Sequence, residues 1–311
     1  MKKKIILANP RGFCAGVDRA IAIVEKALDK YGAPIYVRHE VVHNKYVVDN
    51  LKKRGAIFIE DVQDVPQNSI LIYSAHGVPL SVRKEAQNKN LKMIFDATCP
   101  LVSKVHVEIK NLHRQGYTIV MIGHKGHPEV EGTMGQVEGD IYLIETINDI
   151  LNLPIKTDIE KIAVVTQTTL SVDETKLLID KLKSVFSNLK LPKNEDICYA
   201  TQNRQDAVKK LVKVCDLLIV IGSKNSSNSN RLKELAENLG VTAYLIDFAS
   251  EIEKDWLTNA NVLGVTAGAS APEILVEGVI NKLNSFGFDS IEILEAVEEN
   301  MLFALPNDLR H

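Results

Sequence analysis

The stretch Asn9-Pro10-Arg11-Gly12-Phe13-Cys14-Ala15-Gly16-Val17-Asp18 is typical of a strand end, a tight glycine loop and a helix start, and it places Cys14 in the loop. Cys99 and Cys198 stand at the same point of two further copies of this plan. Each cysteine is followed by a helical pattern, a short apolar run and, 25 residues after the cysteine, a polar residue. These polar residues are His39, His124 and Ser223. The recurrence predicts three copies of one α/β unit.

The three copies are predicted to span residues 1–97, 98–195 and 196–282. The tail, residues 283–311, shows no matching pattern and is expected to pack back on the copies. Strands that alternate with helices indicate an α/β fold with mainly parallel sheets, in three units related by a pseudo-threefold axis. Because ligands bind at the carboxyl ends of parallel strands, the polar loops at these ends are expected to line one central cavity.

The composition is that of an ordinary globular protein, with 311 residues of which 45% are hydrophobic and 25% are charged. A net charge of −3, with no basic block beyond Lys2-Lys3-Lys4, argues against general nucleic-acid binding. The N-terminal stretch has no signal-peptide core of useful length, and no apolar run approaches the length of a membrane span. The cytoplasm is therefore the expected compartment, and the four cysteines are not expected to form disulfides there.

The three equivalent cysteines predict a shared metal or iron–sulfur site. Each precedes a predicted helix, where the positive end of the helix dipole favours a thiolate. Three thiolates would leave one iron of a four-iron cluster open for a substrate oxygen. The alternative is three separate buried thiols, because free cysteine is commonly a small core residue. Cys215 stands at the place that Gly116 holds in the second copy, 17 residues after the repeated cysteine, and is interpreted as a structural residue at a helix end.

Three histidines, His43, His76 and His127, lie in loops that follow predicted strands and are candidates for binding an anion such as phosphate. Taken singly, each could equally be a capping or core histidine. The run Ser226-Ser227-Asn228 fits a helix N-cap or, within a segment rich in donors, a phosphate nest. The sequence has no Walker loop and no G-x-G-x-x-G motif, so nucleotide binding lacks its usual support.

Glu129, beside His127 and Pro128, is the leading candidate for a proton donor in the cavity. A dry site near a negatively charged cluster would raise the pKa of this carboxyl and suit it to that role. Glu131 is the competing acid. Thr168 lies in the loop that matches the loop of His76, and its hydroxyl could position the substrate or relay a proton. For each of these residues, an ordinary loop hydrogen bond is the alternative.

At these residues the chain resembles the family of 4-hydroxy-3-methylbut-2-enyl diphosphate reductases, which catalyse the last step of the methylerythritol phosphate route to isoprenoids. The resemblance extends over nearly the whole chain, from residues 8–17 to residues 264–272, and such long blocks are far more specific than a short motif. The blocks between them are residues 38–44, 74–78, 96–106, 127–136, 166–173 and 222–231.

The resemblance implies a [4Fe–4S] cluster held by Cys14, Cys99 and Cys198. It implies reductive dehydroxylation of (E)-4-hydroxy-3-methylbut-2-enyl diphosphate to isopentenyl and dimethylallyl diphosphate, through a cluster with an open iron. Glu129 is implied as the proton source, and Thr168 and His127 complete the catalytic set. The residues implied to bind the substrate are His43, His76, His127, Thr168, Ser226, Ser227, Asn228 and Ser270. Electrons are expected from a ferredoxin or a flavodoxin, because no flavin or nicotinamide site is visible.

Three other interpretations stay open from the residues alone. An iron–sulfur lyase or condensing enzyme of the quinolinate synthase type would share the three-unit plan but would not remove the hydroxyl of the allylic diphosphate. A redox sensor or a diphosphate-binding protein would bind without turnover. A zinc site with three cysteine ligands would be colourless after strictly anaerobic purification.

Overall fold

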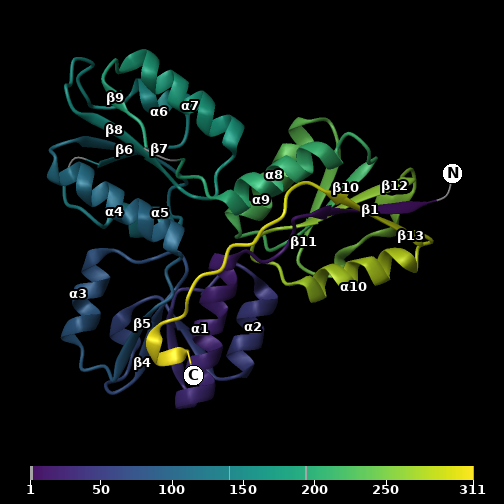
Figure 1. Ribbon diagram of the computed structural model, residues 1–311, viewed down its shortest axis with the longest axis horizontal. Helices are drawn as coiled ribbons and strands as arrows, with labels where there is room; N and C mark the ends of the chain where they lie inside the picture. Colours follow the sequence, from purple (N-terminus) through teal and green to yellow (C-terminus); the bar gives the residue numbers. More distant parts are fainter. Residues whose placement is uncertain (1–2, 140, 193–194, 311) are drawn as a thin grey trace. The chain divides into compact units, whose positions relative to one another are not determined.

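The computed structural model describes residues 3–139, 141–192 and 195–310. The chain forms two compact bodies, which we call body 1 and body 2. Body 1 comprises residues 1–18, 42–50 and 199–302, and body 2 comprises residues 19–41, 51–198 and 303–311. Figure 1 shows one parallel sheet in body 1 and two in body 2. Two helices have residues in both bodies, namely α1 (Ala15–Tyr31) and α2 (Lys45–Lys53).

Body 1 is built on a five-stranded parallel sheet with the order β11-β10-β12-β1-β13. Alternate residues of its strands enter two separate cores, so that Ile5 and Leu7 belong to one apolar cluster and Ile6 and Ala8 to the other. Strands that are apolar on both faces are typical of a parallel sheet covered by helices on both sides. The strands are β1 (Lys4–Asn9), β10 (Leu217–Ile221), β11 (Thr242–Ile246), β12 (Val262–Ala267) and β13 (Ser290–Glu295). The other helices are α8 (Tyr199–Leu211), α9 (Ser227–Asn238) and α10 (Glu273–Asn284), with the short η2 (Ala249–Glu251) and η3 (Lys254–Leu257).

Body 2 contains two four-stranded parallel sheets, with the orders β3-β2-β4-β5 and β7-β6-β8-β9. The strands of the first sheet are β2 (Ile35–Arg38), β3 (Ala56–Ile59), β4 (Ile70–Tyr73) and β5 (Met93–Asp96). Those of the second are β6 (Thr118–Ile122), β7 (Ile141–Ile144), β8 (Ile162–Thr166) and β9 (Leu189–Lys190). The helices are α3 (Leu80–Asn88), α4 (Pro100–Arg114), α5 (Pro128–Met134), α6 (Ile147–Leu151) and α7 (Val172–Val185), with the short η1 (Val62–Asp64) and η4 (Asn307–Leu309).

The three sheets share one strand order, which confirms the α/β class and the repeated plan. Leaving aside β13, the orders β3-β2-β4-β5, β7-β6-β8-β9 and β11-β10-β12-β1 correspond strand by strand. The fourth strand of each sheet is the one that precedes a cysteine in the sequence, β5 before Cys99, β9 before Cys198 and β1 before Cys14. Each cysteine therefore stands where the chain passes from the fourth strand of a sheet to the next helix.

The strand pairing departs in one respect from the three ranges predicted for the copies. As domain boundaries, these ranges stay a prediction. β1 lies in the range 1–97, yet it pairs with β12 and β13 and not with β2 to β5. The first copy already has its fourth strand in β5, so β1 fills the equivalent place in the sheet of the last copy. From the tail, β13 adds a fifth strand beside β1, with Ile6 opposite Glu292.

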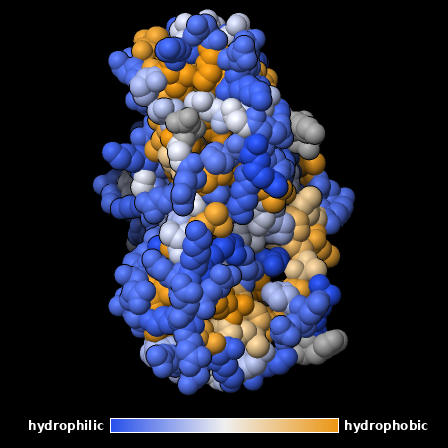
Figure 2. All heavy atoms as spheres, turned by 90° about the vertical axis from the view of Figure 1, so that its left-hand side faces the viewer, coloured by the Kyte–Doolittle hydropathy of each residue, from blue (hydrophilic) through white to orange (hydrophobic). Residues whose placement is uncertain are grey.

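Within residues 3–139, 141–192 and 195–310, no helix is both long enough and apolar enough to cross a bilayer. Hydrophilic side chains cover most of the face seen in Figure 2, and the hydrophobic patches on it are separate from one another.

The core of body 1 is closely packed at Gly264 of β12, next to Leu211 of α8. A Cβ atom added to Gly264 would lie 2.9 Å from Cys215 Sγ and 3.0 Å from both Leu211 Cγ and Leu218 Cδ1. Cys215 itself is buried in this cluster, as expected for a structural thiol. The glycine therefore serves close packing between strand and helix.

We expect Gly264→Ala to lower the free energy of unfolding by about 1–3 kcal/mol, because the new methyl group overpacks a site closed on three sides. Gly278→Ala in α10 is the matched control, since a Cβ there meets no atom within 4 Å. Relief of the helix penalty of glycine should stabilise that variant by about 0.5–1 kcal/mol. Urea unfolding of both variants checks the signs, and a stable Gly264→Ala protein would contradict the packing argument.

Candidate active site

The three predicted cysteines are held by the same backbone hydrogen bond. In each case the cysteine N–H donates to a carbonyl oxygen in the loop that follows the third strand of a sheet. The pairs are Cys14 to Ala269 at 3.2 Å, Cys99 to Ala75 at 2.9 Å and Cys198 to Thr168 at 3.0 Å. Each cysteine also stands directly before a helix, namely α1, α4 and α8. The structure thus places the three thiols in equivalent local environments.

These environments suit thiolate ligands. None of the four cysteines is in a disulfide; Cys14, Cys99 and Cys198 are partly exposed, whereas Cys215 is buried. A helix N-terminus stabilises the negative charge of a thiolate. At Cys14, burial raises the pKa of the thiol and the nearby Arg204 guanidinium opposes that effect. Three soft sulfur donors of this kind fit an iron–sulfur cluster by their chemistry.

The meeting of the three sulfurs stays a prediction. Cys14 belongs to body 1, and Cys99 and Cys198 belong to body 2. Across the described part of the chain, no three or more His, Cys, Asp or Glu side chains are gathered as a metal ion would require. The structure does show that each cysteine follows the fourth strand of a sheet and makes the same backbone hydrogen bond to the loop after the third strand.

In body 2, Glu129 and Thr168 form a buried pair. Glu129 is only 4% exposed, and its two carboxylate oxygens accept from the N–H of Thr168 at 2.6 Å and from the Thr168 hydroxyl at 2.9 Å. The competing acid, Glu131, is exposed on the same helix. Of the two acids considered from the sequence, only Glu129 therefore has the desolvated setting that a proton donor needs.

Burial raises the pKa of Glu129 to about 7, although both hydrogen bonds from Thr168 act to lower it. The charge of Asp196 raises the pKa further. Asp196 is itself buried, with a pKa raised by burial to about 7, and it accepts the N–H of Thr166 at 3.1 Å. Near neutral pH, the Glu129 carboxyl is therefore poised between its protonated and ionised forms.

Two of the predicted histidines lie together in body 2. The rings of His76 and His127 are 5.7 Å apart between centroids and meet edge to face at 83°. His127 caps α5, because its Nδ1 accepts the N–H of Glu129 at 3.1 Å. This bond leaves Nε2 as the donor nitrogen of a neutral His127 ring. The ring of His39, a weaker candidate from the sequence, lies 6.1 Å from the ring of His76 between centroids.

Close packing of α5 brings His76 and His127 together. A Cβ atom on Gly132 would lie 3.2 Å from the carbonyl group of Gly77, and one on Gly135 would lie 2.5 Å from Pro79. Both glycines face the loop that carries His76, and only their lack of a side chain allows this approach. Gln136, which is buried, donates to the carbonyl of Val78 at 2.8 Å and closes the same contact.

The remaining predicted residues form a polar nest in body 1. Ser226 caps α9, and its hydroxyl oxygen accepts from the N–H of Ser229 at 3.4 Å. The Ser270 hydroxyl donates to the carbonyl of His43 at 2.8 Å and lies 3.5 Å from the hydroxyl of Ser226. Asn225 Nδ2 lies 3.4 Å from His43 Nδ1. His43, Ser226 and Ser270 therefore converge at the start of one helix.

Asn228 makes this nest a candidate binding site. Its side chain is only 4% exposed, and neither its amide nitrogen nor its amide oxygen has a hydrogen-bond partner within the residues described. An unsatisfied buried amide is costly, and a ligand oxygen accepting from Nδ2 would relieve part of that cost. Asn228 also lies in the first turn of α9, next to Ser227, where the helix dipole favours an anion.

Several residues that hydrogen-bond to the loops of the candidate site were not predicted from the sequence. Arg204 is fully buried on α8 and donates to carbonyls of the Cys14 loop. Gln167 is fully buried, and its amide oxygen accepts the N–H of His124 at 3.0 Å. Asp196, two residues before Cys198, is a third case. All three act through backbone groups far away in the sequence, which no local pattern reveals.

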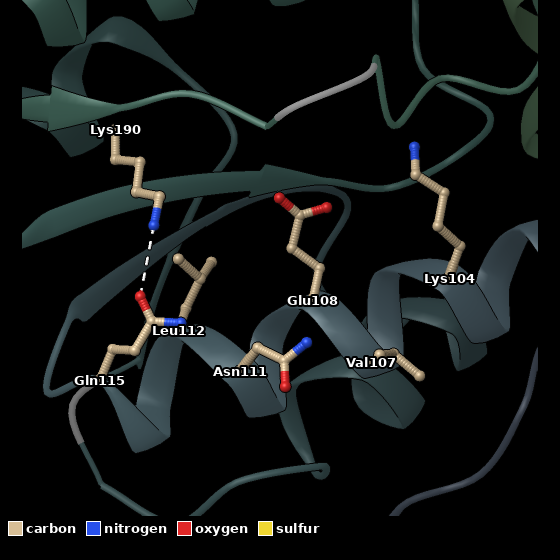
Figure 3. Close-up of a pocket in the computed structure, with 7 residues that line it drawn as sticks. All are labelled: Lys104, Val107, Glu108, Asn111, Leu112, Gln115 and Lys190. Atoms are coloured by element: carbon tan, nitrogen blue, oxygen red, sulfur yellow. Dashed lines mark hydrogen bonds between the residues drawn. The ribbon is translucent and has the colours of Figure 1, made fainter.

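A separate cavity of about 290 Å³ lies in body 2 along the exposed side of α4 and contains none of the predicted site residues. Figure 3 shows its lining, in which Lys190 donates to Gln115 at 3.5 Å and Lys104, Glu108 and Asn111 project from α4. Lys104 also lies 3.7 Å from Asp196. The lining mixes charges of both signs and holds no converging set of donors, so it indicates no ligand.

Comparisons with known proteins agree over the full length of the chain. Residues 5–284 match the family described as LytB protein. The 4-hydroxy-3-methylbut-2-enyl diphosphate reductase of Chromobacterium violaceum is 60% identical over 310 residues, covering 100% of this chain and 99% of that protein. The reductase of the same name from Histophilus somni is 59% identical, covering 99% of this chain and 98% of that protein.

A solved structure has the same fold. The E-1-hydroxy-2-methyl-but-2-enyl-4-diphosphate reductase of Plasmodium falciparum is similar with a TM-score of 0.96 and 41% sequence identity, over 99% of this chain and 97% of that chain. At this level of identity and coverage, the likeness extends to the whole architecture.

We expect Glu129→Gln to change how stability depends on pH. The pKa of Glu129 is 4.5 in the ordinary state and about 7 in the folded protein, so the wild type loses stability as the pH rises through this window. Glutamine does not ionise. The free energy of unfolding of the variant, relative to wild type, should therefore rise between about pH 5 and about pH 8, by on the order of 3 kcal/mol.

Urea unfolding at the two pH values measures this difference. Glu131→Gln is the matched control, because that carboxylate is exposed, and its difference from wild type should stay nearly constant. A Glu129→Gln difference as flat as that of the control would show that Glu129 is not a buried titrating acid.

Proposed function

The chain belongs to the LytB protein family and is an oxidoreductase, and on this premise we propose that it reduces (E)-4-hydroxy-3-methylbut-2-enyl diphosphate to isopentenyl and dimethylallyl diphosphate. In this reaction a carbon–oxygen bond breaks, a carbon–hydrogen bond forms, and the hydroxyl leaves as water. Two electrons and two protons balance the change. The protein must therefore supply electrons, deliver protons and hold the diphosphate.

One residue carries the proposal, because it joins two of these tasks. The carbonyl of Thr168 accepts the N–H of Cys198, while its own N–H and hydroxyl hold the carboxylate of Glu129. Cys198, a proposed cluster ligand, and Glu129, the proposed proton donor, thus both hydrogen-bond to Thr168. A structural core would not need a desolvated acid at this point.

We propose that Cys14, Cys99 and Cys198 hold a [4Fe–4S] cluster. The support is the donor set, three partly exposed thiols in equivalent positions at helix starts. The cluster, when bound, would supply the electrons and an iron that acts as a Lewis acid toward the hydroxyl oxygen.

Glu129 delivers the proton in this proposal. With a pKa of about 7, its carboxyl holds a proton near neutral pH and gives it up without a large energetic cost. The Thr168 hydroxyl, 2.9 Å from the carboxylate, can pass that proton on or orient the substrate hydroxyl. His127 supports the geometry, since it caps the helix on which Glu129 lies.

The diphosphate is bound by neutral donors rather than by a basic cluster. The polar nest of body 1 supplies hydroxyls, the Nδ2 of Asn228 and a helix N-terminus, and we propose His76 and His127 as further donors. Binding energy from this remote group would orient the allylic end for reaction. The residues proposed to contact the diphosphate are His43, His76, His127, Ser226, Ser227, Asn228 and Ser270.

Electrons reach the enzyme from outside in this proposal, from a ferredoxin or a flavodoxin, because the sequence carries no motif for a flavin or nicotinamide. We propose the cytoplasm as the place of action, a reducing compartment in which the four cysteines would stay thiols.

We expect Glu129→Gln to bind the substrate with affinity close to wild type but to reduce it at least about 100-fold more slowly, because the proton donor is lost. Single-turnover reduction of the allylic diphosphate with a chemical reductant measures the rate. The wild-type rate should fall as the pH rises through about 7, where Glu129 loses its proton. Glu131→Gln should react like wild type, and a Glu129→Gln protein with wild-type rates would overturn the assignment.

We expect Cys99→Ser to lose most of its bound iron, because an alkoxide is a poor replacement for a thiolate at iron. Iron and sulfide are counted after anaerobic purification, together with the visible spectrum. Cys215→Ser provides the matched control, since Cys215 is buried in the core, and it should retain the iron of wild type. Full iron in Cys99→Ser would contradict the ligand set, and zinc in place of iron in the wild type would refute the cluster.

A further inference from the structure

Arg204 holds the peptide groups that lead into Cys14. Its side chain is fully buried, and its guanidinium donates to the carbonyl of Gly12 at 2.7 and 3.1 Å and to that of Phe13 at 3.3 Å. These are the two residues directly before the cysteine. The loop is fixed from the other side as well, since the N–H of Gly12 donates to Ala267 at 3.0 Å.

The loop has little room to rearrange. Gly12 has a φ of +66°, and a Cβ atom on it would lie 3.0 Å from the carbonyl oxygen of Ala271. The Gly12 peptide is thus pressed between the loop that follows β12 and the guanidinium of Arg204. The position of Cys14 therefore depends on the position of the Arg204 guanidinium.

Glu299 of the C-terminal tail holds Arg204. Its carboxylate accepts from Arg204 Nη1 at 3.0 Å and from Asn203 Nδ2 at 2.9 Å, and its side chain is 14% exposed. β13 aligns the tail along β1 just before this point, where the N–H of Ala296 donates to Asn9 at 2.8 Å. The pairing of β13 with β1 therefore also places Glu299 next to Arg204.

An arginine is needed for this arrangement. The planar guanidinium offers five N–H donors, and here it serves the Cys14 loop, the carbonyl of Ala200 at 2.9 Å and Glu299 at the same time. A lysine ammonium could not span all three partners. Removing Glu299 would leave the buried guanidinium without the carboxylate that it hydrogen-bonds, so the position of Arg204 depends on Glu299.

We propose that Arg204 is a positioning residue for Cys14 and that Glu299 locks it, so that the tail strand β13 and the segment after it form part of the apparatus that seats a cluster ligand. This inference rests on the proposed function for the role of Cys14. It assigns to the tail a task that its sequence does not suggest. The contacts that carry it all lie within body 1.

The test uses Glu299→Ala, because variants of the fully buried Arg204 risk misfolding. Hydrogen exchange is measured on the full-length, iron-free chain. The amides of Gly12 and Cys14, which donate to Ala267 and Ala269, should exchange about tenfold faster in the variant, since the charged bond that fixes the loop is gone. Exchange in β10 should match wild type and shows that the fold is intact.

Two further variants sharpen the test. Glu299→Gln keeps an acceptor oxygen for Arg204 and should exchange at a rate between those of wild type and Glu299→Ala. Glu298→Ala removes the exposed neighbouring carboxylate and should behave like wild type. In the iron-loaded proteins, a chelator should remove iron several-fold faster from Glu299→Ala than from Glu298→Ala.

The two proposals fail separately in this design. Exchange of Gly12 and Cys14 that is equal in Glu299→Ala and Glu298→Ala would overturn the lock, whatever iron the protein binds. Faster exchange with unchanged iron release would overturn the link between the lock and the ligand. A wild-type chain that takes up no iron would instead overturn the proposed function, while the exchange comparison would still report on the lock.

Discussion

The hydrogen bond from each cysteine N–H to the loop after the third strand is the contact on which the rest of the structure depends. It can form because the strand before each cysteine pairs in parallel with that third strand. Parallel pairing brings the carboxyl ends of the two strands to the same edge, so the cysteine and the loop meet there without further guidance. Each thiol then stands at a helix start, with reactive loops beside it.

Burial sets the chemistry of the groups around these thiols. Glu129 is desolvated yet held by two hydrogen bonds, so its carboxyl remains usable as an acid near neutral pH. Asn228 is buried with its amide unsatisfied within the described residues, which leaves it ready for a ligand. Arg204 is buried with every partner in place and is therefore structural. All three side chains are buried, and their hydrogen-bond partners decide how they differ. Glu129 is a candidate acid, Asn228 a candidate ligand-binding group, and Arg204 a structural support.

Close approach between elements is the second requirement of the site. Gly132 and Gly135 let α5 reach the loop of His76, and Gly12 lets the Cys14 loop pass under the carbonyl of Ala271. The tail contributes in a similar way, since β13 pairs with β1 and carries Glu299 to the buried Arg204. Parts of the chain with no repeat signature therefore support the repeated parts that carry the chemistry.

The sequence by itself determined the α/β class, the repeated plan around Cys14, Cys99 and Cys198, and the candidate acid and anion-binding residues. These follow from local patterns, because apolar periodicity, glycine loops and the offset between equivalent residues are all written along the chain. Only the tertiary structure decided which sheet β1 joins, that Glu129 rather than Glu131 is buried, and that Arg204 and Glu299 pair. Parallel strands of similar apolar composition can pair in several orders, and the burial of a polar side chain depends on residues far away in the sequence, 39 positions for Glu129 and Thr168 and 95 for Arg204 and Glu299. Strand order and side-chain burial depend on packing in three dimensions, so local sequence patterns cannot predict them.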